Sequence, residues 1–272
     1  MTPAIRSPLR YPGGKSKALP QILPLVPPFD EFREPFVGGG SVFIHLKQDV
    51  THARFWINDL NRDVYLFWQA ARDHNPQLVD AVSQIRRQHP SDGRALFERY
   101  KDNWDALSDF ERAVRFFVLN RITFSGTIDS GGFSQQAFKK RFTESSIQRL
   151  AALASLLQGV VITNDDYQSL LDAPGQDVFI FLDPPYYSNP ESRLYGKKGD
   201  LHTGFDHARF AAAMRACPHR WLITYDDCPE VRDLFSFAHI KPWRLQYGMN
   251  NYGQATAAAG NELFIANYPL SS

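Results

Sequence analysis

The sequence has 272 residues, of which 43% are hydrophobic and 22% charged, and its formal net charge is +1. This composition excludes a disordered chain, and it gives no argument for nucleic-acid binding through overall positive charge. Two cysteines, Cys217 and Cys228, are too few for a disulfide framework or a zinc site. Because the sequence shows no signal peptide and no long apolar run, we expect a cytoplasmic protein with neither a membrane nor a metal partner.

The first informative stretch is Arg10-Tyr11-Pro12-Gly13-Gly14-Lys15, which leads into a short apolar helix over about residues 18–26. The paired glycines let the backbone approach a ligand closely, and Lys15 adds a positive charge at the turn. The spacing is not that of a phosphate-binding P-loop.

A strand over residues 31–37 runs into Gly38-Gly39-Gly40-Ser41 and then a helix, which is the opening of a nucleotide-binding βαβ unit. Phe43 replaces the third glycine of the dinucleotide fingerprint, so a NAD-dependent oxidoreductase is a distant alternative. A second strand, residues 54–57, ends in Asn58-Asp59, where an acidic residue can hold ribose hydroxyls. The pattern favours a nucleoside ligand.

Helical periodicity dominates from residue 66 to residue 150, and no strand pattern occurs there. We therefore predict a helical insertion over residues 66–150. It interrupts a catalytic domain formed by residues 1–65 and 151–272.

The last part of this insertion, residues 115–149, carries more cations than acids and contains several glycines. The aromatic residues Phe133, Phe138 and Phe142 are interleaved with the charges. Such a segment suits a surface that grips a phosphate backbone and reads base edges.

Two further strands end in acidic and aromatic residues. Residues 160–163 are followed by Asn164-Asp165-Asp166-Tyr167, which could receive the amino group and the face of a purine. The apolar run 178–182 is typical of a strand buried on both faces of a parallel sheet, and it ends in Asp183-Pro184-Pro185-Tyr186. This tetrapeptide therefore lies at the edge where open α/β sheets bind ligands.

The tetrapeptide can hold a planar amine. Its prolines stiffen the turn, and the carboxylate of Asp183 and the carbonyl of Pro184 can each accept one N–H bond. The ring of Tyr186 offers a face for stacking.

The remaining chain completes the sheet. Residues 187–204 are predicted as a mobile loop over the active edge, and Asp206 as the N-cap of a helix. Residues 221–225 form another buried strand, and residues 244–247 and 263–268 are predicted as two antiparallel closing strands.

Together these motifs resemble the Dam-type (D12 class) DNA adenine-N6 methyltransferases over nearly the whole chain. The matching stretches are residues 10–15, 34–41, 57–61, 183–186 and 261–268. The resemblance implies an α/β fold with a Rossmann-like S-adenosylmethionine-dependent methyltransferase sheet. It also implies a helical insertion domain that carries much of the target recognition.

The resemblance also implies roles for individual residues. Those implied in binding S-adenosylmethionine are Tyr11, Lys15, Phe36, Gly38, Gly40, Asp59, Asp166 and Asp183. Those implied in catalysis are Asp183, Pro184 and Tyr186. For DNA, Asn120 and Arg121 resemble the start of the reading segment, and the basic cluster of Lys139, Lys140 and Arg141 is expected to bind phosphates.

The implied activity is methyl transfer from S-adenosylmethionine to N6 of adenine in double-stranded DNA, after the base leaves the duplex. We expect a monomer and an association with restriction-modification. Two alternatives remain: methylation of another planar amine such as cytosine N4, and a catalytically silent DNA-binding module. Asp183 favours adenine, since cytosine-N4 enzymes more often carry serine there, and the full set of polar residues disfavours a silent module.

Overall fold

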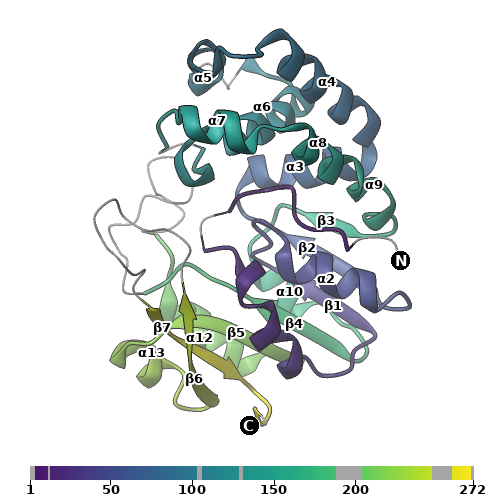
Figure 1. Ribbon diagram of the computed structural model, residues 1–272. Coiled ribbons are helices and arrows are strands. Elements are labelled where there is room, and N and C mark those ends of the chain that lie inside the picture. The colour runs from purple at the N-terminus through teal and green to yellow at the C-terminus, as the bar shows by residue number, and fades with distance from the viewer. Residues whose placement is uncertain are drawn as a thin grey trace.

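The computed structural model describes residues 4–11, 13–102, 106–128, 131–187, 204–246 and 259–270. They form one seven-stranded sheet with a layer of helices beyond its upper edge (Figure 1). The strands are β1 (Glu31–Glu34), β2 (Arg54–Asn58), β3 (Val161–Thr163), β4 (Val178–Leu182), β5 (Arg220–Asp226), β6 (His239–Gln246) and β7 (Ala259–Ala266).

The strand order is β3-β2-β1-β4-β5-β7-β6. Strands β1 to β5 pair in parallel, and β7 pairs antiparallel with both β5 and β6. The predicted antiparallel closure is therefore confirmed, although β6 begins earlier than predicted, at His239. Because β1 has β2 on one side and β4 on the other, the chain order reverses there, and open α/β sheets bind ligands at such a switch point.

Strand β4 is buried on both faces, as its sequence predicts. Phe179 and Phe181 contribute to the core on one face, whereas Ile180 and Leu182 contribute to the core on the other. The first face is covered by α1 (Leu19–Ile22), α2 (Ser41–Asp49) and α3 (Arg62–Asp73), and the second by α10 (Gln168–Asp172), α12 (His207–Ala216) and α13 (Pro229–Leu234). Short 3-10 turns η1 (Lys15–Lys17) and η2 (Leu23–Leu25) flank α1, so the predicted apolar helix is short and broken.

The helical layer contains α4 (Asn75–Gln88), α5 (Gly93–Lys101), α6 (Asp109–Ile122), η4 (Phe124–Gly126), α7 (Gln135–Arg141), α8 (Glu144–Ala151) and α9 (Leu153–Leu156). Helix α6 starts with a capping box formed by Ser108 and Glu111, and every residue from Ala113 to its end is buried. Phe67 of α3 packs against Phe116 of α6 with ring centroids 5.6 Å apart, so the sheet and the helical layer share one core.

The aromatic residues of the basic segment differ from the prediction. Phe138 and Phe142 are buried, and Phe133 packs against the same core. Phe138 and Phe142 therefore stabilise the helical layer and are not available to stack on bases, whereas Phe133 is half-buried. Most of the predicted mobile loop, residues 188–203, lies outside the described residues.

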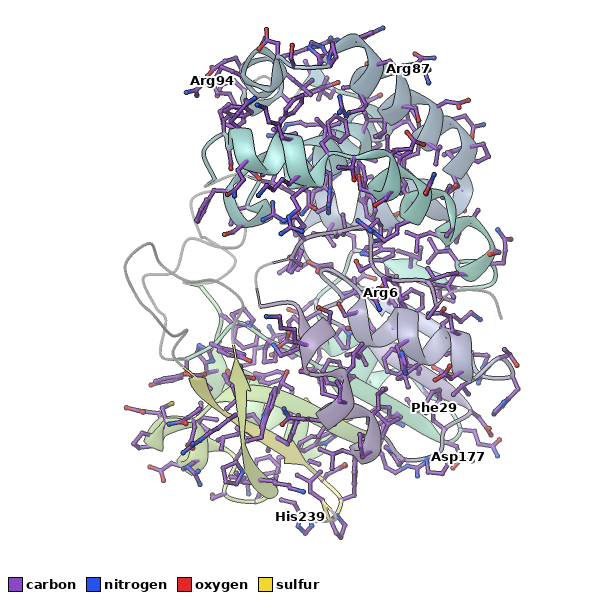
Figure 2. The ribbon with its side chains drawn as sticks, viewed as in Figure 1. Arg6, Phe29, Arg87, Arg94, Asp177 and His239 are labelled. Carbon is purple, nitrogen blue, oxygen red and sulfur yellow. The ribbon has the colours of Figure 1, made fainter. Side chains whose placement is uncertain are left out.

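The sheet is oriented with its carboxyl edge toward the helical layer. Phe29 and Asp177, which precede β1 and β4, lie in the lower right part of the molecule (Figure 2). Residues that follow these strands therefore face the helices. Within the part of the chain that is described, no helix combines the length and apolar character needed to cross a bilayer.

Candidate active site

A cleft opens at the carboxyl edge of the sheet. Its lining includes every residue predicted to bind the cofactor, namely Tyr11, Lys15, Phe36, Gly38, Gly40, Asp59, Asp166 and Asp183. The structure thus brings together residues from the N-terminal turn and from the ends of β1, β2, β3 and β4. Their contact with a cofactor stays a prediction.

Asp183 follows the last residue of β4 and is held from two sides. The ammonium of Lys15 lies 2.7 Å from Oδ1 and 2.8 Å from Oδ2, and the hydroxyl of Thr224 donates to Oδ1 at 2.8 Å. Lys15 also donates to the Gly13 carbonyl, and its side chain is 3% exposed, whereas that of Asp183 is 21% exposed. The carboxylate is therefore fixed in orientation but still reaches the cleft.

Tyr186 lies beside this ion pair. The Lys15 ammonium is 5.1 Å from the ring centroid, and the ring stacks on that of Tyr225 with a centroid distance of 6.1 Å. The Tyr186 hydroxyl donates to Glu262 of β7 at 2.8 Å. Pro184 is buried, and Pro185 is the proline that lines the cleft.

The glycine turn after β1 forms the floor of the cleft, and Tyr11 lies across it. Gly38 and Gly40 have φ angles of +43° and +64°, which other residues adopt only with strain. A Cβ atom on Gly38 would lie 2.6 Å from the Tyr11 ring, and one on Gly39 would lie 2.8 Å from Tyr11 Cβ. Glycine is thus required both for the backbone conformation and for the close approach of Tyr11.

Two carboxyl groups border this turn. Asp59 accepts hydrogen bonds from the backbone N–H groups of Gly38 and Asn61, both at 2.9 Å, while burial raises its pKa to about 6. Glu34 accepts from the backbone of Phe43 at 3.0 Å, and burial raises its pKa well above the usual range. Asp59 thus links the end of β2 to the glycine turn. Its place at this edge of the sheet is the one that the strand pattern predicts.

Aromatic rings close the other end of the cleft. Phe36 packs against Tyr167 with centroids 5.7 Å apart, and Arg209 lies 5.0 Å from the centroid of Tyr167. Arg209 also forms two hydrogen bonds with Asp166, at 2.8 and 3.0 Å. Burial opposes ionisation of Asp166, but the hydrogen bonds from Arg209 and from the Gln168 backbone outweigh it and lower the pKa of Asp166.

The prediction that Asn120 and Arg121 contact DNA is not supported by their positions. Both are buried near the end of α6. Asn120 exchanges hydrogen bonds with the Arg10 backbone, at 2.8 and 2.7 Å, and Arg121 donates to the carbonyls of Pro8 and Arg141. These bonds to Pro8 and Arg10 anchor the N-terminal segment that carries Tyr11 and Lys15. Because the polar groups of Asn120 and Arg121 already bind backbone groups, they are not directed at a ligand.

Lys139, Lys140 and Arg141 are exposed in the last turn of α7, as a phosphate-binding role requires. Phe124 is a further exposed residue that the sequence did not single out, and 69% of its surface is accessible. It precedes Ser125, which has a φ of +57°, and Gly126, which has a φ of +79°. A large apolar side chain is thus presented on a tight turn.

Sequence reasoning also missed Thr224, Arg209 and Glu262. Thr224 lies near the end of β5, so the strand-end rule that selected Asp183 could have found it. Arg209 is in the first turn of a helix whose predicted N-cap, Asp206, accepts from its backbone N–H at 2.9 Å. Glu262 gives no such signal, because its position beside Tyr186 depends on the antiparallel closure of the sheet.

Comparison with known proteins gives the family. The model of the D12 class N6 adenine-specific DNA methyltransferases matches residues 11–249 of this chain. The chain belongs to this family. The family assignment made from the motifs is therefore confirmed.

Similar proteins include DNA methyltransferases from phage and bacteria. The chain is 25% identical over 237 residues to a DNA N-6-adenine-methyltransferase of Escherichia phage P1, and the match covers 85% of this chain but only 31% of the phage protein. It is 24% identical over 236 residues to the type II methyltransferase M1.LlaDCHI of Lactococcus lactis subsp. cremoris, covering 83% of this chain and 74% of that one. It is 25% identical over 185 residues to the DNA adenine methylase of Escherichia coli K12, covering 65% and 64%.

Proposed function

We propose that this protein transfers the methyl group of S-adenosylmethionine to N6 of adenine in double-stranded DNA. The position of Asp183 carries the proposal. Its carboxylate ends the central strand, is oriented by Lys15 and Thr224, and lines the same cleft as the glycine turn. An amine can therefore be held by a fixed acceptor while a nucleoside cofactor lies beside it.

The residues of the cleft fit S-adenosylmethionine. The glycine turn lines the cleft, Asp59 at the end of β2 can accept from ribose hydroxyls, and Asp166 can accept from the amino group of an adenine ring that packs against Phe36. The bound cofactor supplies an electrophilic methyl group on a positively charged sulfur. Family membership implies a methyl donor, and this lining supports S-adenosylmethionine as that donor.

The protein's own part in the chemistry is to activate and position the amine. The exocyclic nitrogen of adenine is a weak nucleophile, since its lone pair is delocalised into the ring. In our proposal the carboxylate of Asp183 and the carbonyl of Pro184 each accept one of its N–H bonds. This draws the nitrogen toward tetrahedral geometry and localises the lone pair for in-line attack, so that positioning supplies most of the rate enhancement.

The target base has to leave the duplex, because a stacked base does not reach the rim of the sheet. Extrusion costs a few kcal/mol. Stacking of the base on Tyr186 would return about 1–3 kcal/mol, by analogy with single-strand binding. The contact between Tyr186 and Tyr225 keeps the ring ready for this role.

The helical layer supplies the DNA surface in this proposal. Lys139, Lys140 and Arg141 bind phosphates, and Phe124 contacts the base stack as an apolar wedge. We expect one protein copy per site, acting in the cytoplasm where DNA and the cofactor meet. Because relatives of this chain include type II methyltransferases, we also propose a role in modifying DNA at a defined sequence.

Incubation of the purified protein with double-stranded DNA and methyl-labelled S-adenosylmethionine, followed by digestion to nucleosides, tests the proposal. We expect label in N6-methyladenine. Label in N4-methylcytosine would show that residues 183–186 accept the amino group of cytosine instead. DNA binding without any transferred label would identify a silent DNA-binding module.

A further inference from the structure

The strongest unassigned group is Glu262, in β7 and beyond the residues that the family model matches. Only 1% of the surface of Glu262 is accessible to solvent. One carboxylate oxygen, Oε2, accepts from the Tyr186 hydroxyl at 2.8 Å, and the other, Oε1, is buried with no hydrogen-bond partner among the described residues. A carboxyl with one unpartnered buried oxygen is costly to keep ionised, so its presence calls for a functional explanation.

Among the described residues, the charges that act on Glu262 are those of Lys15, Asp183 and Asp226. In the sheet it is opposite Asp226 of β5 and Trp243 of β6. Lys15 from η1 attracts the ionised carboxylate, whereas Asp183 from the end of β4 and Asp226 repel it. Lys15 is already paired with Asp183, so Glu262 faces that cation as a second carboxylate.

We infer that Glu262 is a positioning residue that responds to charge: it holds the Tyr186 ring through its hydroxyl, and it releases a proton when the sulfonium of the cofactor enters the cleft. This inference rests on the proposed function, because it takes S-adenosylmethionine as the ligand. The sulfonium would add a second positive charge to the cleft that Lys15 lines, and ionised Glu262 would supply a negative charge to balance it. The ionised carboxylate is also the better acceptor for the Tyr186 hydroxyl.

The titration of Glu262 supports this reading. Burial, opposed by Lys15 and by the hydrogen bond from Tyr186, raises the pKa of Glu262 to about 7. A group with this pKa is partly protonated at neutral pH. A nearby cation lowers the pKa of a carboxyl, so cation binding shifts Glu262 toward its ionised form and a proton passes to the solvent.

The ionisation of Glu262 would then change as the positive charge of the cofactor is lost in the reaction. Methyl transfer breaks the carbon–sulfur bond, whose electron pair stays on sulfur, and forms a carbon–nitrogen bond to N6, which afterwards loses a proton to water. The remaining S-adenosylhomocysteine has an uncharged sulfur. Glu262 therefore takes up a proton from the solvent after turnover, and in its ionised form it favours the charged substrate over the uncharged product.

Calorimetric titration without DNA tests this directly. The full-length protein is titrated at pH 7 with S-adenosylmethionine and with S-adenosylhomocysteine, in buffers of different ionisation enthalpy, so that the number of protons released is measured. We expect S-adenosylmethionine to release more protons than S-adenosylhomocysteine, by up to about half a proton. The permanent charge of the sulfonium is the relevant difference between the two ligands.

Two variants assign the proton to Glu262. In Glu262→Gln the amide oxygen still accepts from Tyr186 but does not titrate, so the difference between the two ligands should disappear while binding persists. In Tyr186→Phe the lost hydrogen bond raises the pKa of Glu262, so the release should move to higher pH. A proton lost from Glu34 would not respond to either change.

The outcomes separate the inference from the proposed function. Absence of S-adenosylmethionine binding in the unmodified protein would overturn both. Binding with the same proton release for both ligands, or a difference that persists in Glu262→Gln, would overturn the role of Glu262 alone.

Discussion

The rim of the sheet and the helical layer both contain charged side chains, but they use them differently. At the rim, Lys15, Thr224 and the Gly38 backbone orient Asp183 and Asp59, which still line an open cleft. In the helical layer, the side-chain N–H groups of Asn120 and Arg121 donate to backbone carbonyls. A polar side chain that is oriented by hydrogen bonds but still lines a cleft can bind a ligand. A side chain whose donors are bonded to backbone carbonyls supports the fold instead.

The largest expected effect is on the rim. Replacement of Asp183 by Asn keeps the shape but removes the charge that holds the amine, and we expect turnover to fall about 10³-fold in the labelling assay. Because this change leaves the charge of buried Lys15 without its carboxylate, the double variant Asp183→Asn with Lys15→Met serves as the stability control. It should recover thermal stability but not activity. Near-normal turnover in the single variant would contradict the assignment of Asp183.

The next prediction concerns the exposed cations of α7. Changing Lys139, Lys140 and Arg141 together to Ala should weaken DNA binding and lower the slope of log K against log salt by up to about 3 units. The control changes Arg87, which lies at the top of the helical layer (Figure 2), and Arg54, at the start of β2. This control should keep the original slope, and an unchanged slope in the triple variant would remove α7 from the DNA footprint.

The buried cation of α6 should behave in the opposite way. Arg121→Met leaves the carbonyls of Pro8 and Arg141 unsatisfied, so we expect a loss of about 2–3 kcal/mol in the free energy of unfolding. Burial and the neighbouring arginines lower the pKa of Arg121 to about 9. The exposed counterpart Lys139→Met should change stability by less than about 0.5 kcal/mol. A reduced salt slope in Arg121→Met with unchanged stability would return Arg121 to the DNA surface.

The smallest effect is the pH response of Asp59. Its pKa of about 6 means that it gains a proton as the pH falls through 6, and one oxygen then ceases to accept. Affinity for S-adenosylmethionine should therefore fall by up to about tenfold per pH unit below 6. Measuring this affinity in the Glu262→Gln variant removes the contribution of the Glu262 carboxyl, whose pKa is about 7.

The contribution of Asp59 to folding stability depends on pH in the opposite direction to its contribution to cofactor affinity. Since the folded state raises its pKa, the contribution is fully present below the ordinary pKa of an aspartate and is lost as the pH rises through 6. An affinity that is flat between pH 5 and pH 7 would show that Asp59 does not receive the ligand.

These regions also differ in how far the sequence predicts them. In a parallel sheet, the end of each apolar run places its next residues at one rim, so Asp59 and Asp183 could be located before their distances were known. A helix has no comparable rule when all its sides are buried, as in α6, and the basic residues around Arg121 could not be sorted into inner and outer ones. Glu262 was missed for a third reason: its contact with Tyr186 joins segments that only the strand order brings together.

A crystal structure with bound S-adenosylmethionine would show whether the cofactor and Asp183 share one cleft. We expect the cofactor between the turn of residues 38–40 and Asp59, with its methyl group directed toward Asp183 and Tyr186. Cofactor bound elsewhere, or bound with its methyl group turned away from Asp183, would contradict this expectation.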